Sequence, residues 1–512
     1  LFFLLVNFFF FCYYLMFTLF FLLVNFFFFF FFLFFFFFFL FFFFFFFFFS
    51  FFFFFFFGFF FFFFFFFFPV FFFIFLLFFF LSTHAFSNSV IGKAYNGITQ
   101  ATLDNGLKII VKTDKRAPVF ISQLWYKVGA SDESRPTTGV SHMLEHMMFK
   151  GTYAYKSGEF SRIIARNGGD ENAFTSKDYT AYYQKMHKSK LELAIKMEAD
   201  RMRNLTFSNR ELTKERQVVI EERRMRVEDK PNSKVYENLR FISFDEKGAY
   251  HSPVIGFQAD IESYSLNDLR VWYEKYYAPN NATLVVVGDV DPIQVIDFAK
   301  KYFGNYRYNP DIKVSKNPSI TLKGHSKILK LKAELPFYVL SFPVPSLKTT
   351  TNESTAYKLE MLAYALDNGL SKKLIRNQQI ASSIGVGYRL YDKYDTLFTI
   401  SFIPAQGVNN DTVLSAIKTQ VAELINKPAL IKDELIRTKA QLEADFVFEQ
   451  DQISTQSYYL GMLSTVGLGI DKMFTYVDQM NNVSAEDVAT VAKQYLIFSN
   501  ANSVELIPQE IK

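Results

Sequence analysis

The sequence is poor in cysteine, and its first part has no charged residue. The one cysteine among 512 residues is Cys12, and no Lys, Arg, Asp or Glu precedes Lys93. A single thiol excludes an intramolecular disulfide framework. Residues 1 to about 81 are mostly phenylalanine, and Leu1–Phe8 recurs almost unchanged as Leu19–Phe26. This is low-complexity sequence, so we expect no packed domain in it.

The phenylalanine-rich tract is long enough to cross a bilayer, since a spanning helix needs about 20 residues. It lacks the flanking Lys and Arg that orient membrane spans and the variety of residues that packs them. No methionine lies between Met16 and Met143. We interpret the tract as a translated homopolymer upstream of the true start, and we expect no stable membrane span in the mature chain.

The end of the tract resembles a targeting signal. Phe71–Leu81 supplies an apolar segment, and Ser82–Ala85 ends in a small residue where a signal peptidase can cut, although no basic segment comes first. The absence of cysteine after Cys12 is compatible with this reading. We predict that residues 1–85 form a leader that can act as a signal segment, and that the protein is periplasmic or in the cell envelope.

Charge of one sign is not concentrated anywhere in the remaining chain. The formal net charge is +5, with Lys and Arg interleaved among Asp and Glu. Proteins that bind nucleic acid usually carry a basic patch or stripe, so we expect no nucleic-acid partner. About 425 residues remain after the leader, enough for two domains of ordinary size.

The second half repeats the first in weaker form. Ser265–Thr283 resembles Ser484–Asn502 at a constant offset, and a Pro/Asn/Lys-rich stretch near 305–317 separates the halves. Alternating strand patterns and periodic helices occur in both. We predict an α+β fold of two homologous domains, 90–305 and 318–512, each a mostly antiparallel sheet packed with helices, which face one another across a cleft.

The motif His142-x-x-Glu145-His146 carries most of the chemical information. A helix is expected here, and positions i, i+3 and i+4 then share one face. Two imidazoles can bind one Zn²⁺ while the carboxylate handles the proton of a water molecule. Two surface histidines on an ordinary helix are the alternative. At the repeat offset the motif becomes Met361–Ala365, which has no ligands, so only the first half can hold a metal.

A catalytic zinc site usually takes three protein ligands, so a third must come from another element. The segment 209–227 has the pattern of a helix with several glutamates. Glu215 and Glu222 lie seven residues apart on nearly one face. We predict Glu222 as the ligand and Glu215 as the group behind it, with solvated surface charges as the alternative.

These residues together resemble the pitrilysin/insulinase family of zinc metallopeptidases, and particularly its bacterial processing-peptidase-like branch. The resemblance runs from about Ala94 to Pro508 and includes Val128–Glu133 before the motif, Met148–Thr152 after it, and Asn172–Ser176. It implies one Zn²⁺ per chain, held by His142, His146 and Glu222, with Glu145 as general base. It also implies that an extended peptide substrate pairs with an edge strand formed by Asn172, Ala173, Phe174 and Thr175. The implied activity is that of a zinc-dependent endopeptidase acting on peptides or unfolded segments.

One part of the family pattern is missing. Members that work alone carry an arginine and a tyrosine in the second half, and this chain has Ile375 and Ser382 at the aligned positions. Arg376, Tyr388 and Arg389 lie nearby in the sequence. We therefore expect a metal-bearing subunit that pairs with a sister subunit carrying the Arg/Tyr pair, or a homodimer. A non-catalytic peptidase-like binding or scaffold subunit is the alternative function.

Overall fold

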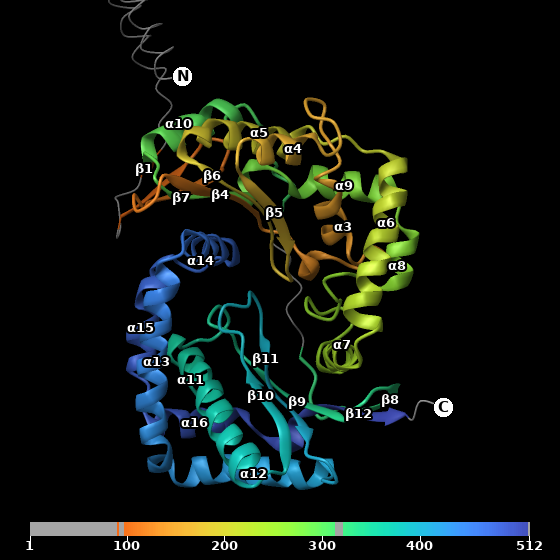
Figure 1. Cartoon of the computed structure of the whole chain (residues 1–512), viewed down its shortest axis with the longest axis vertical. Coiled ribbons are helices and arrows are strands. Elements are labelled where there is room, and N and C mark those ends of the chain that lie inside the picture. The colour runs from red at the N-terminus through yellow and green to blue at the C-terminus, as the bar shows by residue number, and fades with distance from the viewer. Residues whose placement is uncertain (1–89, 92–96, 313–320, 510–512) are drawn as a thin grey trace, which may run out of the picture. The chain divides into compact units, whose positions relative to one another are not determined.

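The computed structural model describes residues 90–91, 97–312 and 321–509, and residues 88–512 form one compact unit. The predicted leader, 1–85, lies outside the described residues. Within the described part, no helix has both the length and the apolarity that a membrane crossing requires. The elements are labelled as in Figure 1.

The first half is built on a seven-stranded sheet with the order β1-β2-β3-β7-β4-β6-β5. All neighbouring strands are antiparallel except β3 and β7, which are parallel. The central strand β7 is buried along its whole length, which explains its continuous apolar sequence. The strands are β1 (Val90–Ile91), β2 (Ile98–Thr102), β3 (Lys108–Thr113), β4 (Val119–Tyr126), β5 (Asp170–Thr175), β6 (Thr180–His187) and β7 (Ala282–Gly288).

The second half contains a five-stranded sheet with the order β10-β11-β9-β12-β8. It too has one parallel pair, β8 with β12, among antiparallel neighbours. The predicted α+β class with mostly antiparallel sheets is therefore confirmed. The strands are β8 (Ser326–Lys332), β9 (Phe337–Val344), β10 (Ala381–Gly387), β11 (Thr396–Pro404) and β12 (Asn502–Gln509).

Helices of the first half cover one face of its sheet, where Phe120, Leu124 and Leu284 meet Met143 and Met147 in the main core. The helices of the first half are α3 (Val140–Met147), α4 (Glu159–Arg166), α5 (Leu191–Arg203), α6 (Asn209–Arg223), α7 (Pro231–Ser243), α8 (Gln258–Ser263), α9 (Leu266–Tyr276) and α10 (Pro292–Phe303), of which α7 packs elsewhere. The second half contributes α11 (Glu353–Leu370), α12 (Asn410–Asn426), α13 (Lys432–Gln450), α14 (Ile453–Val466), α15 (Asp471–Asn481) and α16 (Ala485–Tyr495).

Each half sends a helix onto the sheet of the other. Helix α14 packs on β4 and β7 of the first sheet, where Leu460 and Leu463 join a buried cluster with Trp125 and Val285 (Figure 1). Gly461 is required at this contact, because an added Cβ would lie 2.1 Å from the Trp125 indole. In return, α7 packs on β9 and β12 of the second sheet. This exchange holds the two halves together.

The repeat is visible at the start of two helices. At α9, Ser265 accepts a hydrogen bond from the Asp268 backbone, and the Asp268 carboxylate accepts one from the Ser265 backbone at 2.7 Å. Ser484 and Asp487 form the same capping box at α16, with the corresponding bond at 3.0 Å. A strand follows each helix, β7 in the first half and β12 in the second.

Candidate metal centre

The start of α3 is held by two residues that precede it. Gly139 adopts φ +83° next to the Ile255 carbonyl, which leaves no room for a side chain. The Glu133 carboxylate accepts hydrogen bonds from the backbone of Gly139 at 2.6 Å and of Ser141 at 2.8 Å. It thereby satisfies two donors that a helix N-terminus leaves free. Burial raises the pKa of Glu133 to about 7, although both donors favour the charged form.

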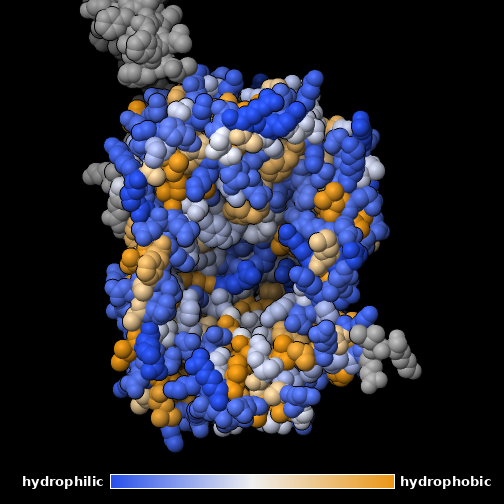
Figure 2. Space-filling model, viewed as in Figure 1, coloured by the Kyte–Doolittle hydropathy of each residue, from blue (hydrophilic) through white to orange (hydrophobic). Residues whose placement is uncertain are grey.

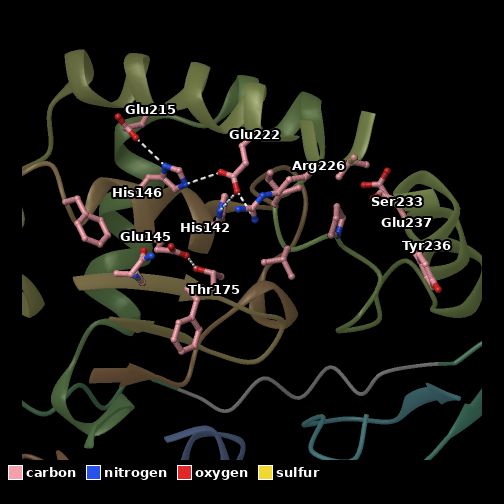
Figure 3. A pocket seen from close by; sticks show the side chains of 18 of the residues that line it. His142, Glu145, His146, Thr175, Glu215, Glu222, Arg226, Ser233, Tyr236 and Glu237 are labelled. Carbon is pink, nitrogen blue, oxygen red and sulfur yellow. Dashed lines mark hydrogen bonds and ion pairs between the residues drawn. The ribbon is translucent and has the colours of Figure 1, made fainter. Parts of the chain in front are cut away.

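His142 and His146 lie on the same face of α3, as predicted, and their ring centroids are 4.8 Å apart. Glu222 reaches both from α6. Its Oε1 is 3.7 Å from His142 Nε2, and its Oε2 is 3.4 Å from His146 Nε2 (Figure 3). One ligand atom from each of the three residues lies within 4.8 Å of the others. Among the described residues, only these three form such a group.

This donor set fits zinc. Two imidazole nitrogens and one carboxylate oxygen are typical ligands of catalytic Zn²⁺ sites. Ligand atoms at about 2.0–2.1 Å from a tetrahedral ion lie roughly 3.4 Å apart. The two separations between Glu222 oxygens and histidine Nε2 atoms, 3.7 and 3.4 Å, are close to this value. The Nδ1 atom of His142 is buried and has no hydrogen-bond partner.

Glu215 lies behind His146, on the same face of α6 as Glu222. Its Oε2 is 3.3 Å from His146 Nδ1, and its Oε1 is 2.7 Å from the Lys150 ammonium (Figure 3). Such an interaction fixes the orientation of a ligating imidazole. Burial acts to raise the pKa of Glu215, but the hydrogen bonds to His146 and Lys150 lower it overall.

Electrostatics distinguish the two imidazoles. Burial, together with the neighbouring His146 charge, lowers the pKa of His142 to about 4. Burial also acts to lower the pKa of His146, but hydrogen bonds to Glu215 and Glu222 raise it to about 9. The pKa of Glu222 is lowered chiefly by its bond to His146. The Glu215 and Glu222 carboxylates therefore favour a positive charge next to them, which a bound metal ion would supply.

Glu145 lies on α3 beside the two histidines and faces β5. Thr175, the last residue of that strand, donates its hydroxyl hydrogen bond to Glu145 Oε2 at 2.5 Å (Figure 3). Burial raises the pKa of Glu145, while this hydrogen bond acts in the opposite direction. From the sequence, Thr175 was expected only to pair with substrate through its backbone. Its side-chain hydrogen bond to Glu145 was not predicted, because it depends on how β5 packs against α3.

Strand β5 lies at the end of the first sheet and pairs with β6 only, among the described strands. Asn172, Ala173, Phe174 and Thr175 line a cavity of about 830 Å³ together with the three ligand residues. The predicted edge strand therefore borders the metal centre. Its unpaired backbone groups are available to an extended chain.

Arg226 was not identified from the sequence. It follows α6 in the π-helical turn Arg224–Glu228, and its guanidinium lies 2.9 Å from Glu222 Oε1. The i, i+4 spacing from Glu222 is the signal that predicts such a contact. Arg226 neutralises part of the charge on the carboxylate and holds it near the histidines.

The second half contributes no side chain to the cavity that holds the metal centre, as far as the described residues show. Ser382 is exposed on β10, and Tyr388 donates its hydroxyl to the Pro345 carbonyl at 2.7 Å. Tyr388 and Arg389 line a second cavity, of about 940 Å³, between the halves. The two cavities share Thr175 and three other residues. Figure 2 shows a hollow with a largely hydrophilic lining on this face.

A helix-borne H-x-x-E-H motif, joined by a glutamate from a second helix, is the arrangement of the inverted-motif zinc peptidases. Comparison with known proteins agrees. Residues 108–253 match the family model "Insulinase (Peptidase family M16)", and residues 263–442 match "Peptidase M16 inactive domain". The chain belongs to the M16 insulinase/pitrilysin family of zinc proteases, as predicted.

Individual relatives cover most of the chain. The zinc protease PqqE of Helicobacter pylori is 29% identical over 419 residues, which are 80% of this chain and 92% of that protein. The crystal structure of a protease from Helicobacter pylori has a TM-score of 0.74 and 26% identity, and the match covers 80% of this chain and 99% of that one. The first half of the periplasmic protease PqqL from Escherichia coli has the same fold, with a TM-score of 0.67 and 18% identity over 82% of this chain and 94% of that one.

Proposed function

We propose that the protein is a zinc-dependent endopeptidase that hydrolyses peptides or unfolded segments. One Zn²⁺ per chain is held by His142, His146 and Glu222. One observation carries the proposal: the ligand atoms of these three residues lie within 4.8 Å of one another, beside Glu145 and the unpaired edge of β5. When bound, the ion would polarise a peptide carbonyl and lower the pKa of a water molecule towards neutrality.

Glu145 moves the proton in the proposed reaction. Its carboxylate accepts a proton from the attacking water and then donates it to the leaving amine nitrogen, so that the C–N bond breaks with a neutral amine. Burial favours a carboxyl that can hold the proton between the two steps. Thr175 orients the carboxylate through Oε2 and leaves the other oxygen for the substrate side.

Strand β5 selects the form of the substrate. Backbone pairing along Asn172–Thr175 needs an extended chain, which a folded domain does not offer. The two connected cavities, of about 830 and 940 Å³, give such a chain room on both sides of the scissile bond. These features support cleavage within a chain rather than at its end.

The proposed chain organisation follows the sequence. Residues 90–305 form the metallopeptidase domain, 318–512 form a peptidase-like domain without zinc ligands, and 1–85 form a leader that can act as a signal segment. The apolar segment Phe71–Leu81 and the likeness to a periplasmic protease support a periplasmic or envelope location.

We also propose that the chain works with a partner. Ser382 and Ile375 replace the expected tyrosine and arginine, and no side chain of the second half reaches the metal cavity in the described part. A lost oxyanion donor costs about 10²–10³-fold in rate. Co-expression with a sister subunit bearing the Arg/Tyr pair is expected to raise kcat by about 10²-fold. A lone monomer whose kcat such a subunit leaves unchanged contradicts the pairing.

Zinc content and cleavage measured together test the proposed function. Glu145→Gln keeps the three ligands but removes the proton carrier, so the variant is expected to bind one zinc per chain and to lose turnover of a quenched fluorescent peptide. Glu221→Gln is the control, because Glu221 is exposed and pairs with Arg224 rather than with the site. A Glu145→Gln variant that cleaves at the wild-type rate contradicts the proposal. A wild-type protein that binds zinc and peptide but cleaves nothing favours the binding or scaffold subunit.

A further inference from the structure

Glu360 is a carboxyl that the proposed proteolytic site does not use. It lies on α11 and directly precedes Met361, the residue that corresponds to His142 in the repeat. Its Oε2 atom is buried and accepts no hydrogen bond. Burial raises the pKa of Glu360 to about 8. An ionised carboxyl in such a place is unfavourable unless a donor or a cation reaches it.

The cavity beside Glu360 has a volume of about 160 Å³, and half of its lining residues are aromatic. Most of its lining residues come from α11, α13 and α15. These three helices contact one another in the second half (Figure 1). No Lys, Arg or His is among its described lining residues. The lining consists of Glu360, Tyr364, Tyr391, Leu442, Asp445, Phe446, Glu449, Tyr459, Met473 and Tyr476.

Two further carboxylates stand near the mouth of this cavity. Asp445 and Glu449 are exposed and lie one turn apart on α13. Glu449 bonds to the Tyr459 hydroxyl, and Tyr364 bonds to Tyr476. The hydroxyls of Tyr364, Tyr459 and Tyr476 are thus engaged in hydrogen bonds, and their rings form part of the cavity wall. A negative rim, aromatic walls and a partnerless carboxyl together favour a cation.

The cation that fits is organic rather than a metal ion. The carboxylate oxygens of Glu360, Asp445 and Glu449 do not come close enough together to form a metal-binding group, since only the His142, His146 and Glu222 set does so in the described part. An ammonium group needs a single carboxylate to donate to, and it gains from aromatic faces around it. A cavity of about 150 Å³ admits a guest as large as benzene, so this one has room for an alkyl chain.

We propose that this cavity binds an alkylammonium group, which donates to Glu360 and packs against the surrounding tyrosines. The group is either the side chain of a peptide lysine or a free alkylamine. The lysine source rests on the proposed function: Glu360, Tyr391 and Tyr459 also line the 940 Å³ cavity, which meets the metal cavity at Thr175. A bound peptide then contacts the enzyme at a point remote from the scissile bond, and lysine there increases its affinity.

Calorimetry on the full chain carrying Glu145→Gln tests the site without turnover, so failure of the proteolytic proposal does not affect it. Pentylamine is titrated at pH 7, with pentan-1-ol as the neutral analogue. The amine is expected to bind at least about tenfold more tightly than the alcohol. Adding Glu360→Gln is expected to weaken amine binding at least about tenfold, whereas Glu443→Gln on the exposed side of α13 leaves it unchanged. No amine binding, or equal binding after Glu360→Gln, overturns the proposal.

Proton release on amine binding distinguishes direct contact with Glu360 from a purely structural role of this residue. Glu360 must lose its proton when the ammonium arrives, so the heat of binding is expected to differ between phosphate and Tris buffers. Four tyrosines near Glu360 have raised pKa values and stay neutral at pH 7: Tyr364, Tyr388, Tyr391 and Tyr476. The other acidic residues near Glu360 are Asp445 and Glu449. Equal heats in both buffers count against Glu360 as the partner.

A pair of peptides distinguishes the two sources. One contains a single lysine, and the other carries the same lysine acetylated on its amine. A gain in affinity for the free lysine that disappears with Glu360→Gln assigns the site to substrate. Equal binding of the two peptides, with pentylamine still dependent on Glu360, assigns it to a free amine.

Discussion

The Thr175 hydroxyl donates to the Glu145 carboxylate across 2.5 Å, and so joins the end of strand β5, the proposed substrate-binding strand, to the proposed proton carrier. Thr175 also lines both large cavities. A peptide that pairs with β5 therefore lies next to the residue that orients Glu145. In the proposed reaction, peptide binding and proton transfer therefore depend on the same end of β5.

Replacement of Thr175 by valine tests this link. Valine keeps the shape and the strand preference but removes the donor. A hydrogen bond to a charged group contributes about 1.5–3 kcal/mol, so kcat is expected to fall roughly 10–100-fold while KM changes little. Thr175→Ser restores the hydroxyl and is expected to recover most of the rate. Wild-type kcat in the valine variant contradicts an orienting role.

Metal affinity tests the assignment of Glu222. Glu222→Gln removes the charged ligand oxygens, and zinc affinity measured by competition with a chelator is expected to fall by more than about 100-fold, since even an indirect contact contributes 10–100-fold. Glu221→Gln, its exposed neighbour, is expected to bind zinc like the wild type. Equal losses in the two variants indicate a general effect on α6.

Glu215 is expected to act through His146. It touches the Nδ1 side of the ring and not the side that faces Glu222. Glu215→Gln is therefore expected to weaken zinc binding by about 10–100-fold without abolishing it. Unchanged zinc affinity in this variant contradicts a role of Glu215 through His146, and leaves the ion pair with Lys150 as its function.

The pH dependence of stability tests the environment of Glu360. Its pKa rises from the usual 4.5 to about 8 in the folded chain, so the folded state holds a proton that the unfolded state loses. Stability from this group is complete below pH 4.5 and is lost as pH rises towards 8, by about 1.4 kcal/mol per pH unit. Denaturant unfolding of Glu360→Gln is expected to lack this decline. Parallel pH profiles for wild type and variant contradict the buried, unpaired carboxyl.

A substitution that adds one methyl group, Gly461→Ala, tests the packing of α14 on the first sheet. Gly461→Ala places a Cβ 2.1 Å from the Trp125 ring, and the unfolding free energy is expected to fall by about 1–3 kcal/mol. Gly369→Ala on α11 is the matched control, because nothing lies within 4 Å of its added Cβ. In the control, the better helix propensity of alanine leaves stability unchanged or raised. Similar effects of both substitutions argue against a tight contact at Trp125.

Local patterns in the sequence predicted much of the fold and part of the site. His142, Glu145 and His146 are neighbours in one helix, so their common face follows from helix geometry alone. Glu222 was predicted from the spacing of the glutamates in one expected helix, before the family resemblance added to it, but its place beside the histidines depends on the packing of α6 on α3, which local pattern does not show.

Other contacts depend on tertiary structure and escaped the sequence. The Thr175 hydrogen bond exists because β5 ends beside α3, and the Glu360 cavity exists because α11, α13 and α15 meet. The exchange of α7 and α14 between the halves is equally invisible in hydrophobic periodicity, which shows that a face is buried but not against what.

The most direct test of the metal centre is anomalous diffraction at the zinc edge from crystals of the zinc-loaded protein. We expect a single strong peak per chain, bounded by His142 Nε2, His146 Nε2 and a Glu222 oxygen, each at about 2.0–2.2 Å. No peak at this position in zinc-saturated crystals, or a peak with Glu222 turned away from it, contradicts the account.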